Sequence, residues 1–137
     1  MTEFSKKQNN PSKNTVSDMR VILLVDDNAI NLKMLHQSLG GQGYKLLSAR
    51  SGEDALRIAE KANPDLILLD IMMPGIDGYE TCARLKANET TRNAAIIFLS
   101  ALQATEDKVR GLSLGAVDFI TKPFDPDEII ARVARQL

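Results

Sequence analysis

The sequence has few of the residues that build redox, zinc or nucleic-acid sites. Cys82 is the only cysteine and His36 the only histidine among 137 residues, which excludes an intramolecular disulfide and a zinc cluster. Aromatic residues make up 4% and tryptophan is absent, which argues against base stacking. With 17 basic and 18 acidic residues the formal net charge is −1, so we expect no direct binding to nucleic acid.

Long apolar runs are missing as well. No run approaches the roughly 20 residues that span a bilayer, and the first residues contain no secretory apolar core. We therefore expect a cytoplasmic protein without a membrane partner. Residues 1–18 show no periodic apolar face and are predicted to form a flexible polar tail. Residues 19–137 are long enough for one folded domain with a buried core.

Short apolar runs alternate with segments that have helical spacing. The runs are predicted to be strands at residues 21–25, 44–49, 66–69, 95–99 and 117–121. Because they lack polar alternation, both faces of the sheet must be covered by helices, which is typical of parallel sheets. The pattern predicts an α/β fold: a doubly wound, five-stranded parallel (βα)5 sheet. We expect the flavodoxin-like order 2-1-3-4-5, with ligands at the carboxyl ends of the strands.

Polar residues follow four of the five predicted strands. Asp26 and Asp27 follow the first, Asp70 the third, Ser100 the fourth and Lys122 the fifth. Each of these residues alone could belong to a helix cap or a bend. Together, at one edge of a parallel sheet, they predict a site with three carboxylates, a hydroxyl and an ammonium.

This set of side chains suits phosphoryl transfer. Crowded carboxylates resist ionising together, and Mg²⁺, which prefers oxygen ligands, removes that penalty. Phosphoryl transfer needs mainly positioning and charge neutralisation, which Mg²⁺ and Lys122 can supply, while Ser100 can donate a hydrogen bond. A carboxylate can act as the nucleophile and form an acyl phosphate.

Four separated motifs resemble those of bacterial response-regulator receiver domains of two-component systems. They are VDDN at residues 25–28, LDIMMPGIDG at 69–78, LSA at 99–101 and FITKPF at 119–124. The resemblance covers about residues 20–137, and the motifs agree in order and spacing. It implies a phospho-acceptor regulator that catalyses only its own phosphorylation and dephosphorylation, and is otherwise not an enzyme.

The resemblance also implies residue roles. Asp70 would be phosphorylated by a phosphohistidine of a sensor histidine kinase or phosphotransfer protein. Mg²⁺ would be bound by Asp27, Asp70 and the backbone carbonyl of Met72, with Asp26 acting mainly through water. Ser100 and Lys122 would bind the phosphoryl oxygens, and the bond between Lys122 and Pro123 is expected to be cis.

A conformational switch is implied as well. Ser100 would move toward the phosphoryl group, and Phe119 would rotate into the vacated space. Family members often carry Tyr at this position, and Phe lacks the hydroxyl that would hold the inward state. The surface of the helix at 105–114, the strand at 117–121 and the last helix would change, and it could form a homodimer. Met72 and Leu102 are expected to shield the phosphoryl group and prolong its lifetime.

Three alternatives stay open from the residues alone. Aspartate-nucleophile phosphatases pair the nucleophile with a second Asp two residues later, but Met72 occupies that position here. A receiver-like binding module that works without phosphorylation usually lacks an acidic residue or the lysine, and none is missing. The chain could also be a receiver fragment of a larger regulator or of a hybrid histidine kinase.

Overall fold

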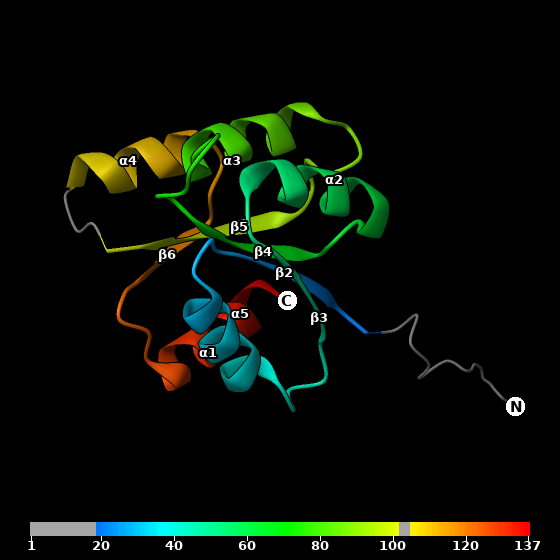
Figure 1. Ribbon diagram of the computed structural model, residues 1–137, viewed down its shortest axis with the longest axis vertical. Helices are drawn as coiled ribbons and strands as arrows, with labels where there is room; N and C mark the ends of the chain where they lie inside the picture. The colour runs from blue at the N-terminus through cyan, green and yellow to red at the C-terminus, as the bar shows by residue number, and fades with distance from the viewer. Residues whose placement is uncertain (1–18, 102–104) are drawn as a thin grey trace, which may run out of the picture.

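Five parallel strands form one sheet in the order β3-β2-β4-β5-β6 (Figure 1). Because β2 is the first strand along the chain, this is the predicted order 2-1-3-4-5, which is confirmed. The architecture is described from a computed structural model for residues 19–101 and 105–137, without the side chains of residues 105–107. The predicted tail at residues 1–18 and Leu102 lie outside the described residues. The strands are β2 (Val21–Val25), β3 (Lys45–Ala49), β4 (Leu66–Asp70), β5 (Ala95–Ser100) and β6 (Asp118–Thr121).

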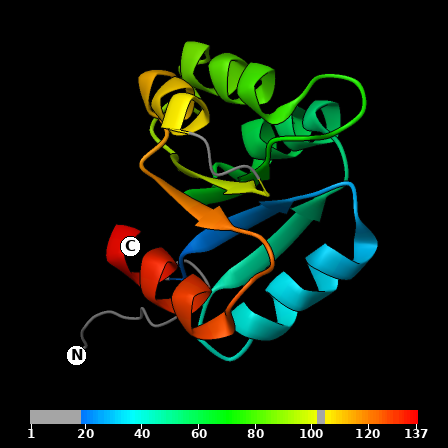
Figure 2. The ribbon, with the colours of Figure 1, turned by 90° about the vertical axis from the view of Figure 1, so that its left-hand side faces the viewer.

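Helices cover both faces of the sheet. They are α1 (Ala29–Leu39), α2 (Gly52–Ala62), α3 (Gly78–Ala87), α4 (Thr105–Ser113) and α5 (Pro126–Gln136). Figures 1 and 2 show α2, α3 and α4 on one face, and α1 and α5 on the other. Among the described residues, no helix has the length and apolar character needed to cross a membrane.

Two apolar cores form because neighbouring residues of a strand point to opposite faces. Leu69 belongs to the core beneath α2 and α3, whereas Leu68 belongs to the core beneath α1 and α5. Both leucines are fully buried, as are most residues of β2, β4 and β5. This burial on both faces explains why the strand sequences show continuous apolar runs rather than alternation.

Polar caps fix where the helices begin. The side chain of Ser51 accepts a hydrogen bond from the amide of Asp54, and that of Asp125 accepts one from the amide of Asp127. Asn28 caps α1 by accepting hydrogen bonds from the amides of residues 30 and 31. A cap of this kind stabilises a helix by about 1 kcal/mol. The caps at Asn28 and Asp125 set the start of helices that directly follow β2 and β6.

Gly78 allows α3 to begin against the end of β4. Its amide donates a hydrogen bond to the carbonyl of Ile71 at 2.7 Å. A methyl group at Gly78 would overlap the carbonyl oxygen of Asp70 and would lie 2.6 Å from Cα of Ile71. The absence of a side chain at Gly78 therefore fixes the turn that follows Asp70.

Candidate functional site

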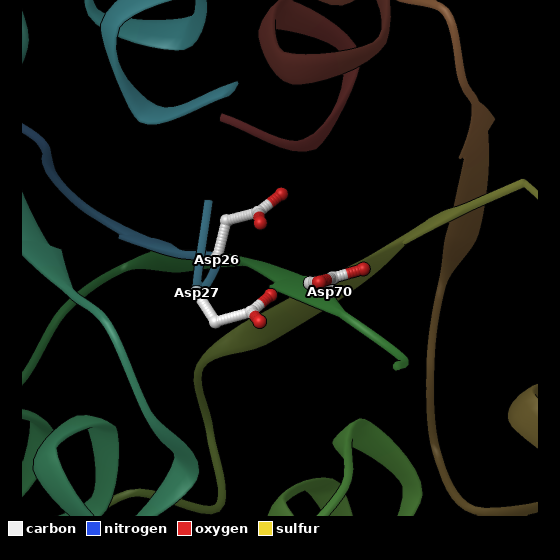
Figure 3. Close-up of side chains that lie close together, drawn as sticks. All are labelled: Asp26, Asp27 and Asp70. Carbon is white, nitrogen blue, oxygen red and sulfur yellow. The ribbon is translucent and has the colours of Figure 1, made fainter. Parts of the chain in front are cut away.

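Three carboxylates lie together at the carboxyl edge of the sheet. Asp26 and Asp27 follow β2, and Asp70 ends the neighbouring strand β4 (Figure 3). Each residue offers a carboxylate oxygen, and these oxygens all lie within 4.8 Å of one another. Asp26 is fully buried and Asp70 is 3% exposed, whereas Asp27 is partly exposed. The cluster is therefore open to solvent mainly on the side of Asp27.

Lys122 supplies the positive charge of this cluster. Its Nζ lies 2.9 Å from Oδ1 of Asp70 and 3.3 Å from Oδ2 of Asp26. The backbone amide of Lys122 donates a hydrogen bond to the carbonyl of Ser100, which joins the ends of β5 and β6. The bond between Lys122 and Pro123 is cis, as expected from the motif. One ammonium thus pairs with two of the three carboxylates.

The charges of the cluster do not balance. Burial raises the pKa of Asp70 to about 6, even though the hydrogen bond from Lys122 favours the carboxylate, and repulsion from Asp26 and Asp27 adds to this increase. Although burial disfavours the ammonium, its interactions with Asp70 and Asp26 raise the pKa of Lys122 above its ordinary value. The site therefore holds excess negative charge that a cation can neutralise.

Two residues at the site were not singled out from the sequence. Asn31 Nδ2 donates a hydrogen bond to Oδ2 of Asp26 at 3.2 Å, and Arg50 Nη2 donates one to the carbonyl of Asp27 at 2.9 Å. Asn31 lies in the first turn of α1, the helix that follows the acidic pair, and that position was the available signal. Arg50 follows β3, whose end lies beside the end of β2, so only the strand order could have indicated it.

Ser100 and Phe119 lie on neighbouring strands. Ser100 is buried at the end of β5, one residue after Leu99, which pairs with Asp70 across the sheet. The Phe119 ring lies 5.6 Å from the Phe98 ring, between centroids. A methyl group at Gly111 of α4 would lie 2.5 Å from Cζ of Phe119. The missing side chain at Gly111 therefore makes room for this partly buried ring against α4.

A family model of the response regulator receiver domain matches residues 22–134. The chain belongs to this family. Response regulator PleD of Caulobacter vibrioides is 43% identical over 112 residues, which are 82% of this chain and 25% of PleD. The alkaline phosphatase synthesis transcriptional regulatory protein PhoP of Bacillus subtilis is 45% identical over 112 residues, covering 82% of this chain and 46% of PhoP.

Solved receiver domains have the same fold. The chemotaxis response regulator CheY4 of Vibrio cholerae superimposes with a TM-score of 0.83 at 30% identity, over 87% of this chain and 99% of CheY4. The chain spans between a quarter and a half of the length of PleD and PhoP. The resemblance inferred from the four motifs is confirmed: this is a receiver domain of the kind found in two-component response regulators.

Of the two residues expected to shield the receiver site, Met72 lies within the described part of the chain. Met72 is 69% exposed in the loop after β4, two residues beyond Asp70. Leu102 lies outside the described residues. The exposure of Met72 leaves its side chain at the surface of the loop rather than in the core.

The raised pKa of Asp70 leads to a stability prediction. Because folding raises this pKa from 3.8 to about 6, ionisation of Asp70 destabilises the fold progressively between about pH 4 and about pH 6. In buffer that contains a chelator and no Mg²⁺, Asp70→Asn should therefore raise the melting temperature of the protein by a few degrees near neutral pH. The increase should shrink as the pH falls through this window.

Calorimetry across the pH range would measure this effect. Asp54→Asn is the matched control, because it removes an exposed carboxylate and should give no comparable increase. If the increase in melting temperature caused by Asp70→Asn stayed constant from about pH 4 to about pH 7, it would not come from ionisation of buried Asp70, and the prediction would be wrong.

Proposed function

We propose that this receiver domain takes a phosphoryl group from a phosphohistidine onto Asp70 in a Mg²⁺-dependent reaction. The observation that supports this proposal best is the pairing of Lys122 with Asp70 and Asp26 beside a third carboxylate. A purely structural ion pair would not need the extra negative charge of Asp27. The donor would be a sensor histidine kinase or a phosphotransfer protein in the cytoplasm, and residues 19–137 would form the phosphorylated domain.

The donor set fits Mg²⁺. Carboxylate oxygens from three residues converge, and hard oxygen donors are the ligands that this ion prefers. Asp27, Asp70 and the backbone carbonyl of Met72 would hold the ion. Both oxygens of Asp26 already accept hydrogen bonds, which favours a contact through water. When bound, Mg²⁺ supplies charge neutralisation for the incoming phosphoryl oxygens.

The reaction forms one bond and breaks one. A carboxylate oxygen of Asp70 forms a bond to phosphorus while the bond between phosphorus and the donor imidazole nitrogen breaks. The imidazole leaves with the electron pair of that bond, and the freed nitrogen then takes up a proton from water. Lys122 would turn from the carboxylates to a phosphoryl oxygen, and the Ser100 hydroxyl would donate to another.

The switch would use the rings packed beneath α4. Movement of Ser100 toward the phosphoryl group would change the space next to Phe119, whose ring already contacts Phe98. Gly111 lies against both rings, since a methyl group there would lie 2.5 Å from Phe119 and 2.9 Å from Phe98. A change at Phe119 would therefore displace α4, because a packed core does not deform continuously.

Phosphorylation at Asp70 can be tested with a small phosphodonor. Acetyl phosphate with Mg²⁺ should add one phosphoryl group, detected by intact mass, and omission of Mg²⁺ should reduce the rate by at least tenfold, since charge neutralisation is the main catalytic term. Asp70→Asn should abolish the addition, whereas Asp77→Asn, which changes the partly exposed cap of α3, should retain it. Labelling of the Asp70→Asn variant at the wild-type rate would disprove the assignment.

We further propose that Met72 and Leu102 prolong the phosphorylated state. Hydrolysis needs a water in line with phosphorus, and an apolar side chain in the loop after Asp70 cannot orient one. Met72→Asn together with Leu102→Glu should speed phosphate loss several-fold, as followed by the decay of the phosphorylated mass. Met72→Leu is the apolar control and should decay as slowly as wild type; equal decay of all three proteins would exclude shielding.

The surface of α4, β6 and α5 is proposed to support a homodimer. Leu112 and Val117 are 52% and 44% exposed there, beside a hollow of about 330 Å³. Charges of both signs surround them, so a two-fold axis can bring opposite charges together. The charged residues are Lys108, Asp118, Glu128 and Arg132.

Sedimentation with Mg²⁺ and beryllofluoride, which mimics the phosphoryl group, would test the dimer. We expect a shift toward dimer relative to the untreated protein. Leu112→Asp should prevent this shift because it would bury an unpaired charge. A monomer at all concentrations, with or without the mimic, would contradict self-association of this chain.

A further inference from the structure

The carboxylate of Asp26 is held by three donors although it is fully buried. The amide of Asn28 donates to Oδ1 at 2.9 Å. Oδ2 is shared: Asn31 Nδ2 donates to it at 3.2 Å, and Lys122 Nζ lies 3.3 Å from it. Two of these donors belong to the start of α1, and the third is the lysine that also pairs with Asp70.

The donors differ in what phosphorylation would do to them. In the proposed function Lys122 would turn toward a phosphoryl oxygen, and this movement would draw the ammonium away from Asp26. Because Asp26 has no exposed surface, the donors left to its carboxylate would be neighbouring protein groups and a water bound to the ion, and an unsatisfied buried charge is costly. Asn31 belongs to α1 rather than to the strand end that carries Lys122, so its amide can stay in place.

We propose that Asn31 is a positioning residue that keeps the Asp26 carboxylate oriented toward Mg²⁺ once Lys122 has left it. This inference rests on the proposed function, because it concerns the state in which Lys122 binds the phosphoryl group. Groups that orient a metal site from its second layer typically change metal affinity by about 10-fold to 100-fold. The effect of Asn31 should be larger in the phosphorylated state than in the unphosphorylated one.

A helix-stabilising effect alone would give a different pattern. The backbone amide of Asn31 donates to the Asn28 cap, and any residue at this position keeps that bond. The side chain is therefore dispensable for capping, and Ala or Leu should fit the first turn of α1 well. A purely structural loss would also weaken Mg²⁺ binding equally in both states.

The test is the Mg²⁺ affinity of Asn31→Ala and Asn31→Leu, measured by calorimetry with and without beryllofluoride. Asn31→Leu keeps the branched shape of the side chain, with somewhat larger end groups, but removes its donor. Without the mimic we expect a dissociation constant within about threefold of wild type; with it, we expect Mg²⁺ to bind about tenfold more weakly in both variants. Thr91→Val is the control, since it removes a buried hydrogen bond to Leu85 near the start of β5 and should change neither affinity.

The outcomes separate this inference from the function on which it rests. A tenfold loss confined to the beryllofluoride state supports the role of Asn31. Equal affinities in wild type and variants, or equal losses in both states, overturn it while the proposed function stands. If Asn31→Leu binds Mg²⁺ with wild-type affinity in the beryllofluoride state while Asn31→Ala does not, packing matters rather than the donor. This outcome also overturns the role proposed for Asn31. Failure of the wild type to bind Mg²⁺ would overturn the proposed function and this inference together.

Discussion

The ammonium of Lys122 lies between two carboxylates that belong to different strands, and the arrangement of the site depends on this contact. Asp26 follows β2 and Asp70 ends β4, so only a parallel sheet with these strands adjacent brings the carboxylates together. The lysine is connected to Ser100 through its backbone amide. Any group that attracts Lys122 away from Asp70 and Asp26 therefore acts on β5 and β6 as well.

The contact is linked to the α4 side of the sheet through packed rings. Phe98 lies between Tyr79 and Phe119, with ring centroids 5.5 and 5.6 Å apart. The guanidinium of Arg110 stacks over Tyr79 at 4.0 Å, so α4 touches this row of rings at more than one point. Such contacts give the helix a defined position that depends on Phe119. A change at the charged edge can thus reach a surface that is remote from Asp70.

Much of this structure could be predicted from the sequence because burial on both faces leaves a continuous apolar run in each inner strand. The same reasoning placed Asp26, Asp27 and Asp70 at one edge, since they follow strands of known order. Predicted strand boundaries were less accurate: strands expected from residues 44 and 117 begin at 45 and 118. Arg50 and Asn31 were missed because their hydrogen bonds depend on side-chain geometry. The position of Asn31 in the first turn of its helix and the strand order beside Arg50 were the only signals, and neither specifies a hydrogen bond.

The position of Lys122 in the phosphorylated state tests the account most directly. A crystal structure with Mg²⁺ and beryllofluoride would show it. We expect beryllium on Asp70, the ion bound by Asp27, Asp70 and the carbonyl of Met72, and Lys122 paired with a fluoride instead of Asp70. A structure in which the mimic binds but Lys122 keeps its contacts with Asp70 and Asp26 would contradict the account.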